Sequence, residues 1–221
     1  HFGAHRNHFI ICLVRTEVPS ENRHAGFSQI IVDLKNDGAK VRPIRNMAGG
    51  EDFNEVVFDN VLVPKDRIVG EPGNGWQQVT SELAYERSGP ERFLSSFRVF
   101  VELVRICGDH PSPHQAAAIG RIASHFMTLR RMSLSVAGML EAGKDVGVEA
   151  ALVKELGNNF EKVLPEIARL VVPDLSAADP ERQRLFRETF EETLMLSPSF
   201  TLRGGTREIL RGVIARGLGL R

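Results

Sequence analysis

The pattern of hydrophobic residues changes once along this chain, at residues 71–75 (Glu-Pro-Gly-Asn-Gly), and this change limits the folds open to it. Before these residues the apolar runs are short, rich in β-branched and aromatic side chains and separated by turn residues, which is typical of strands. After them, apolar residues recur every three or four positions, which is typical of amphipathic helices. The sequence therefore predicts an α+β fold with its strands first and its helices last.

Four strands are expected in the first part of the chain, over residues 9–16, 27–34, 40–45 and 53–63. They are joined by short turn-rich links such as Asn36-Asp37-Gly38, with no helical stretch between them. Such links favour an antiparallel sheet over parallel strands with crossover helices. We expect this β-domain to cover residues 1–72.

Five long helices are expected in a second domain over residues 73–221. The first begins near Trp76 and is predicted to kink at Gly89-Pro90, because proline lacks an N–H donor and clashes with the preceding turn. The others are expected from about residue 113, over 148–170, over 181–196 and after the cap residue Thr206. Long helices with short connections predict an up-and-down bundle.

Composition excludes several classes of function. The formal net charge is +0 and no Lys/Arg cluster is present, which argues against a nucleic-acid partner. No apolar run reaches the roughly 18 residues that span a bilayer. The histidines and the two cysteines lack metal-ligand spacing, so we expect no metal site and two buried free thiols. With no leader peptide visible we expect a cytoplasmic protein, and the start at His1 suggests a fragment.

Glu86 is the most suggestive polar residue, because it falls on a row of apolar residues along the first helix: Val79, Leu83, Phe93 and Phe97. Glu91 falls on a polar face instead. A buried carboxylate is a candidate general base, since loss of water favours its proton-binding form. A structural ion pair between Glu86 and a neighbouring arginine is the alternative, and the residues alone leave both open.

Three segments together resemble the acyl-CoA dehydrogenase family: residues 53–64, residues 83–87 (Leu-Ala-Tyr-Glu-Arg) and residues 203–209 (Arg-Gly-Gly-Thr-Arg-Glu-Ile). The resemblance implies part of the family's middle β-domain followed by its C-terminal helical domain. It also implies an oxidoreductase that uses FAD to dehydrogenate an acyl-CoA thioester between its α- and β-carbons.

The resemblance implies three catalytic positions. In one branch of the family the base precedes the Gly-Thr pair of the closing motif, where this chain has Gly204; in the other it belongs to a Glu-Arg pair on the first bundle helix. Glu86 is therefore expected to remove the α-proton, and Arg87 to be its electrostatic partner and to hold the loop before the last helix. The Gly204 N–H and a flavin hydroxyl would bind the enolate oxygen.

The same resemblance implies FAD contacts at Gly205, Thr206 and Glu208, at the start of the last helix. For Thr206 a simple helix cap is the alternative. The implied partners are an acyl-CoA substrate, an electron-transfer flavoprotein or similar acceptor, and further subunits of a homo- or hetero-oligomer.

Some features depart from the family pattern. Arg203 stands where an aromatic residue is usual, and two flavin-associated segments of the family have no counterpart near residues 105–109 or 164–180. Two other functions therefore stay open. One is a non-catalytic or half-site subunit of a heteromeric acyl-CoA dehydrogenase, and the other is a flavin monooxygenase or oxidase on the same scaffold.

Overall fold

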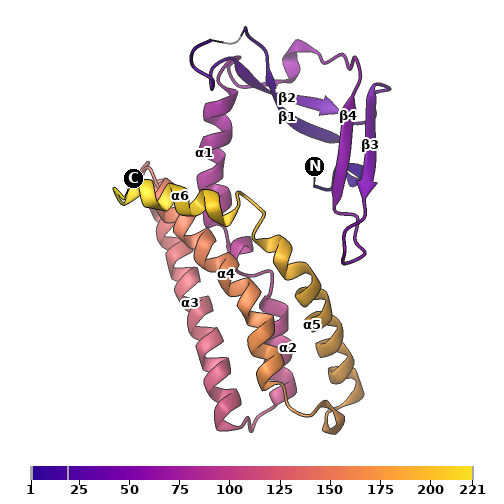
Figure 1. The fold of residues 1–221 in the computed structure, drawn as a ribbon, viewed down its shortest axis with the longest axis vertical. Coiled ribbons are helices and arrows are strands. Elements are labelled where there is room, and N and C mark those ends of the chain that lie inside the picture. Colours follow the sequence, from indigo (N-terminus) through magenta and orange to yellow (C-terminus); the bar gives the residue numbers. More distant parts are fainter. Residues whose placement is uncertain (1, 19, 221) are drawn as a thin grey trace. The chain divides into compact units, whose positions relative to one another are not determined.

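The computed structural model describes residues 2–18 and 20–220, and its contacts divide the chain into two compact units, residues 1–82 and 83–221. The first unit contains the strands, short turns and the first half of a helix, and the second unit is helical (Figure 1). The predicted α+β class, with antiparallel strands followed by a helical part, is confirmed.

Two antiparallel sheets form the first unit. β1 (Phe9–Arg15), β2 (Phe27–Asp33) and β5 (Ile68–Val69) make a sheet of order β1-β2-β5, with Phe9 opposite Asp33 and Arg15 opposite Phe27. β3 (Ala39–Ile44) and β4 (Phe53–Phe58) make a two-stranded sheet. Short 3-10 turns η1 (Ala4–Arg6) and η2 (Lys65–Arg67) lie beside these strands along the chain.

The fourth strand is shorter than predicted. β4 ends at Phe58 instead of residue 63, because the Asp59 N–H bonds to Gly38 O and Asn60 then takes a left-handed conformation with φ 52°. A left-handed residue ends the extended strand. The chain pairs again only at β5, which the sequence did not predict because two residues are too few to show a period.

The first half of α1 (Gly75–Ser88) packs with the strands of the first unit. Gly75 lies so close to the Ser28 backbone that a Cβ would be 2.8 Å from Ser28 Cα, and Gln78 Nε2 donates to Val69 O over 2.8 Å. These contacts explain why the compact unit extends to residue 82. The assignment of residues 1–72 and 73–221 as family domains stays a prediction.

The second unit is a helical bundle. In Figure 1, α2 (Phe97–Cys107), α3 (Pro113–Glu141), α4 (Gly147–Val171) and α5 (Pro180–Phe200) run side by side, and α6 (Arg207–Gly217) crosses α4 near its start. The 3-10 turns η3 (Pro90–Arg92) and η4 (Leu175–Ala177) lie in the connections. Side-chain caps fix two helix starts, since Ser112 and Gln115 form a reciprocal capping box and Asp179 accepts two backbone N–H groups.

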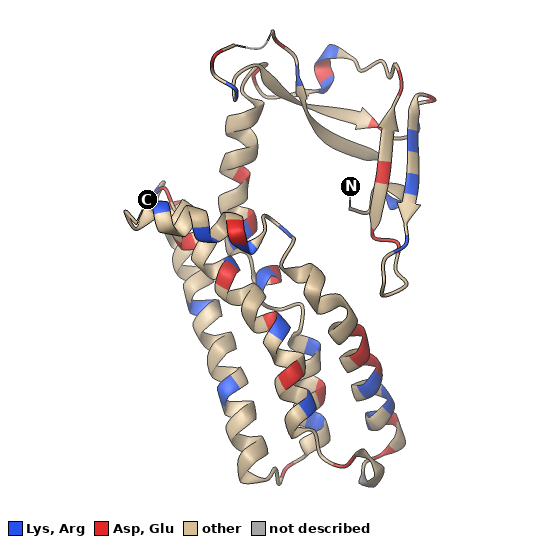
Figure 2. Cartoon of the chain, in the orientation of Figure 1, with Lys and Arg blue, Asp and Glu red and all other residues tan. Residues whose placement is uncertain are grey.

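α4 is the central helix, with buried side chains along much of its length. Its apolar residues share one core with α2, α3 and α5, whose fully or nearly fully buried members include Val99, Leu103, Ile122, Phe126, Val153, Phe160, Leu164 and Phe186. The outward face of α5 is charged instead (Figure 2), with Arg184 paired to Glu181 and Glu188. Across the described residues, no helix has the length and apolarity needed to cross a membrane.

The first helix breaks where a kink was predicted, and this corrects the reading of its apolar face. Gly89 is extended with ψ 155°, as expected of a residue before proline, and Pro90 starts η3. The chain then turns into a separate helix, α2, so Phe93 and Phe97 are not on the face of α1 that carries Glu86.

Candidate functional site

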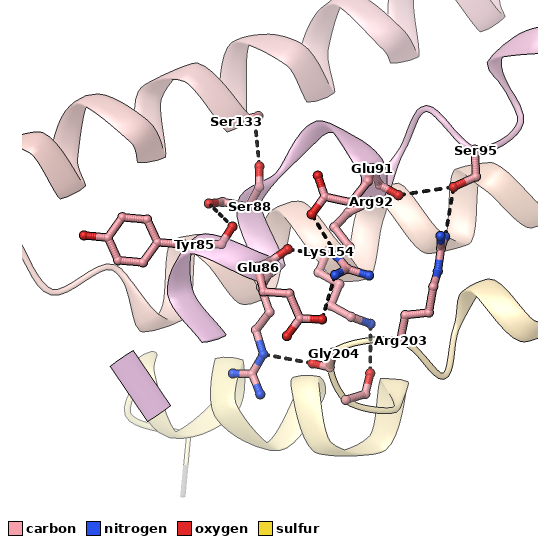
Figure 3. Close-up of polar contacts among 12 residues, drawn as sticks. Tyr85, Glu86, Ser88, Glu91, Arg92, Ser95, Ser133, Lys154, Arg203 and Gly204 are labelled. Carbon is pink, nitrogen blue, oxygen red and sulfur yellow. Dashed lines mark hydrogen bonds and ion pairs between the residues drawn. The ribbon is translucent and has the colours of Figure 1, made fainter. Parts of the chain in front are cut away.

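Glu86 lies in the last turn of α1 and forms an ion pair with Arg92 of η3 (Figure 3). Arg92 Nη2 is 2.6 Å from Glu86 Oε1, and Arg92 Nε donates to Glu86 O over 2.8 Å. The Arg92 side chain is 7% exposed and that of Glu86 is 40% exposed. The carboxylate is therefore held on one side by a buried guanidinium and open to solvent on the other.

One sequence-based expectation about Glu86 is wrong, because the residue is half-buried and not part of a continuous buried stripe. The charge of Glu86 acts on Arg87 as expected, but Glu86 also forms an ion pair with Arg92, which the sequence analysis did not single out. The ion pair follows from the break at Gly89-Pro90, after which the chain turns and Arg92 bonds to the end of α1. A proline in a helical pattern predicts that the helix kinks or ends there, but it does not predict the direction that the chain takes afterwards.

A glycine of α4 allows this return of the chain. A Cβ on Gly157 would collide with Arg92 O and would lie 3.2 Å from Phe93 Cβ. Because Gly157 has no side chain, the backbone of η3 lies directly against α4, and Arg92 of η3 is buried. The position of the Glu86 partner thus depends on a residue far away in the sequence.

The glycine turn before α6 lies beside Glu86. Gly204 and Gly205 have φ angles of 64° and 107°, in the left-handed region that disfavours other residues. A Cβ built on Gly204 would be 3.0 Å from Glu86 Oε1 and 3.3 Å from Glu86 Cδ. The structure thus brings together Glu86 and Gly204, the two alternative positions for a base.

The Arg87 side chain holds this turn by bonding to the backbone of the turn. Its Nε donates to Gly204 O over 3.0 Å, which is the loop-holding contact expected of it. Burial lowers the pKa of Arg87, and the negative charge of Glu86 opposes that effect. None of the ion pairs between described residues joins Arg87 to Glu82, Glu91 or Glu208.

Lys154 of α4 is a second cation at the turn, and the sequence analysis missed it. It is fully buried, and its Nζ donates to Gly205 O over 2.8 Å. One orientation of the Asn158 amide gives hydrogen bonds to both of its neighbours. In it, the oxygen accepts from Lys154 Nζ at 2.7 Å and the nitrogen donates to Phe200 O at 3.2 Å. Burial, followed by the charges of nearby arginines, lowers the pKa of Lys154 to about 8.

The sequence did contain a signal for Lys154. Lys154, Asn158 and Glu161 are spaced by four and three residues on the same helical face as the buried Ala150 and Leu164. Polar residues at these spacings on an apolar face mark a buried polar cluster, by the same reasoning that singled out Glu86.

Glu161 and Arg203 extend the cluster away from Glu86. Glu161 is fully buried, accepts the Ser95 N–H over 2.7 Å and lies 3.1 Å from Arg203 Nη2. Burial raises the pKa of Glu161, and the bonds from Ser95 and the charge of Arg203 oppose that rise. The Arg203 Nε is buried and has no hydrogen-bond partner among the described residues. Arg203, which replaces the usual aromatic residue, therefore ties the turn to α4.

The predicted flavin contacts lie at the start of α6. Thr206 occupies the N-cap position, but its side chain makes no capping bond to a backbone N–H. The backbone N–H of Glu208, followed by the Thr206 hydroxyl, bonds to the exposed Glu208 carboxylate and lowers its pKa. The expectation that Thr206 caps the helix through its side chain is therefore wrong.

A cleft of about 360 Å³ lies in the same unit. Its walls include Tyr85, Ser88 and Pro90 from the α1–η3 corner and Ser133 and Leu140 from α3. Glu86 is not among the residues that line it. The polar cluster around the glycine turn combines a half-exposed carboxylate, buried cations and a backbone turn.

The sequence is similar to acyl-CoA dehydrogenases along nearly its whole length. It is 32% identical to acyl-CoA dehydrogenase IpdE1 of Mycobacterium tuberculosis over 226 residues, covering 98% of this chain and 56% of IpdE1. Acyl-CoA dehydrogenase FadE34 of the same organism is 29% identical and matches 98% of this chain, which covers 29% of that larger protein. No protein-family model matches the sequence.

Solved structures share the fold. A probable acyl-CoA dehydrogenase from Mycobacterium abscessus superposes with a TM-score of 0.81 at 21% identity, covering 99% of this chain and 58% of the other. The ChsE4–ChsE5 complex of Mycobacterium tuberculosis gives a TM-score of 0.76 at 22% identity, covering 100% and 59%. This chain thus spans little more than half of each of these structures.

Proposed function

Because this chain belongs to the acyl-CoA dehydrogenase family, we propose that it forms part of an enzyme that removes two hydrogens from the α- and β-carbons of an acyl-CoA thioester. Glu86 takes the α-proton as general base. When bound, FAD supplies the acceptor for the β-hydrogen, which leaves as hydride. The electron pair left on the α-carbon then forms the new carbon–carbon double bond.

The single observation that carries this proposal is the closeness of Glu86 to Gly204. The two positions are next to each other, since a Cβ at Gly204 would be 3.0 Å from Glu86 Oε1, so a carboxylate at either one would lie in the same part of the site. Gly204 itself cannot titrate, and Glu86 is held by Arg92 with one side open to solvent. A positioned and accessible carboxylate meets the first requirement of a general base, which is geometric.

The start of α6 suits a polar cofactor edge. Thr206 donates no backbone hydrogen bond within the described chain, so its N–H at the helix N-terminus is available to a carbonyl oxygen. Gly205 adds no side chain there. We propose that Gly205, Thr206 and Glu208 hold the flavin, and that the Gly204 N–H and Arg87 orient the thioester and the turn.

Glu86→Gln in the full-length protein tests the base. Gln is nearly isosteric and can still bond to Arg92, so the fold and flavin content should persist while flavin bleaching by saturated acyl-CoAs slows about 10²- to 10⁴-fold. Glu91→Gln is the matched control, because its side chain is 52% exposed and lies 3.7 Å from Arg92. Normal bleaching by Glu86→Gln would overturn the assignment.

A half-site subunit of a heteromeric enzyme is the second candidate. The similarity to the ChsE4–ChsE5 complex favours it, because the solved structure contains two named components. Flavin content separates the two candidates: the full-length protein purified alone should bind FAD if it is a complete homo-oligomer, and only with a partner if it is a half-site. We propose an oligomer in either case, with an electron-transfer flavoprotein or similar acceptor taking the electrons.

A further inference from the structure

Lys154 is a buried titratable group that the proposed chemistry does not use. A lysine with no exposed surface needs hydrogen-bond partners, and Lys154 finds two, Gly205 O and Asn158 Oδ1. Through Asn158 the link continues to Phe200 O at the end of α5. Lys154 therefore fastens α4 to both ends of the segment that connects α5 with α6.

The Gly205 carbonyl belongs to the same peptide group as the Thr206 N–H. Peptide groups are planar, and the described chain contains no cis bond, so the N–H points opposite to the carbonyl. By holding Gly205 O, Lys154 directs the Thr206 N–H away from α4. Arg87 does the same for the preceding peptide group through Gly204 O.

Lys154 also lies beside the candidate base. Its Cε would be 3.1 Å from a Cβ at Gly204, and Glu86 Oε1 would be 3.0 Å from the same point, so these two atoms are no more than about 6 Å apart. The charged groups that act on Lys154 are Glu86 and Arg87 of α1, Arg92 of η3 and Arg203 of the turn. Glu86 is the one carboxylate among them, and it attracts the ammonium group.

From this geometry we propose that Lys154 is a positioning residue, which fixes the Gly205–Thr206 peptide group and keeps a positive charge beside Glu86. The second role rests on the proposed function of Glu86, whereas the first does not.

Hydrogen–deuterium exchange of the full-length protein tests the first role without any substrate. Lys154→Met keeps most of the side-chain volume and removes the donor, so amides of residues 202–206 should exchange about tenfold faster. Lys162→Met, at an exposed position of the same helix, is the control and should exchange as wild type does. An unchanged rate in Lys154→Met overturns the positioning of the turn.

The pH dependence of flavin bleaching by a panel of saturated acyl-CoAs tests the second role. Without the ammonium group, bleaching should slow already at a higher pH than in wild type, since a nearby positive charge favours the ionised form of a carboxylate. Lys154→Gln, which keeps an amide donor but no charge, should show the same shift if Lys154→Met does not fold. If a folded variant shows the same pH dependence of bleaching as wild type, the electrostatic role is overturned.

Failure of the proposed function gives a different result. If wild type is not bleached by any acyl-CoA of the panel, the dehydrogenase assignment is refuted, and faster exchange in Lys154→Met would still support the positioning of the turn. If wild type is bleached and Glu86→Gln is not, but neither readout changes in the Lys154 variants, the inference about Lys154 alone is refuted.

Discussion

Replacing Lys154 by methionine should change how the stability of the protein depends on pH. Lys154 has its pKa lowered from 10.5 to about 8 in the folded protein, mainly by burial. Between those two values the unfolded chain binds more protons than the folded one, so the free energy of unfolding rises with pH. Below about pH 8 the folded protein bears the full cost of keeping this buried amine charged. That cost is relieved as pH rises toward 10.5.

The size of the effect follows from the shift. Each unit of pKa change corresponds to about 1.4 kcal/mol, so the full effect is about 3 kcal/mol, most of it gained between pH 7 and pH 10. Lys154→Met lacks this titration. The stability of wild type relative to the variant should therefore increase by about 2 to 3 kcal/mol over that range, whatever the two lost hydrogen bonds cost at a fixed pH.

Reversible guanidinium unfolding of the full-length protein, followed by helical circular dichroism at pH 7, 8, 9 and 10, measures this difference. Cys12 and Cys107, whose pKa values are raised by burial, are present in both proteins, so their titration cancels in the difference. Lys162→Met, which removes an exposed lysine from the same helix, should give a flat difference from wild type. If the difference in the free energy of unfolding between wild type and Lys154→Met is the same at every pH, the lowered pKa of Lys154 in the folded protein is refuted.

Two further predictions concern glycines. Gly157→Ala should destabilise the protein by about 1 to 3 kcal/mol and displace Arg92, because the added Cβ meets Arg92 O. Gly138→Ala on α3 is the control in the same unfolding assay. It has open space around it and should be neutral or stabilising by up to about 1 kcal/mol. In a Glu86→Ala background, Gly204→Glu should restore part of the flavin bleaching and Gly204→Gln should not. The left-handed φ of 64° at residue 204 should limit the recovery. Equal bleaching by both variants would refute the idea that a carboxylate at residue 204 can replace that of Glu86.

The architecture could be predicted because it depends on local periodicity. The change of period at residues 71–75 marked the passage from strands to helices, and the long helices α3, α4 and α5 are where apolar spacing indicated them. The short elements β5 and η3 were missed because two or three residues are too few to show a repeating pattern.

The site could be predicted only in part, because half of it is made of contacts between segments distant in sequence. Glu86, Arg87 and Gly204 were found through motifs, and the structure places them together. Arg92 was missed because its burial depends on the missing side chain of Gly157. Lys154 was missed because a lone lysine in a helical segment is usually solvated, and only its neighbours on the folded helix show otherwise.

The crowding at Gly204 also restricts the order in which this site could change during evolution. Any side chain gained at Gly204 would press against the Glu86 carboxylate, which Arg92 holds in place, and against the stem of Lys154. A lineage that moved the carboxylate from the first position to the second would therefore have to shorten residue 86 before residue 204 acquired a side chain. The reverse order would pass through an overcrowded and strained intermediate, so the two positions are expected to vary together and not independently.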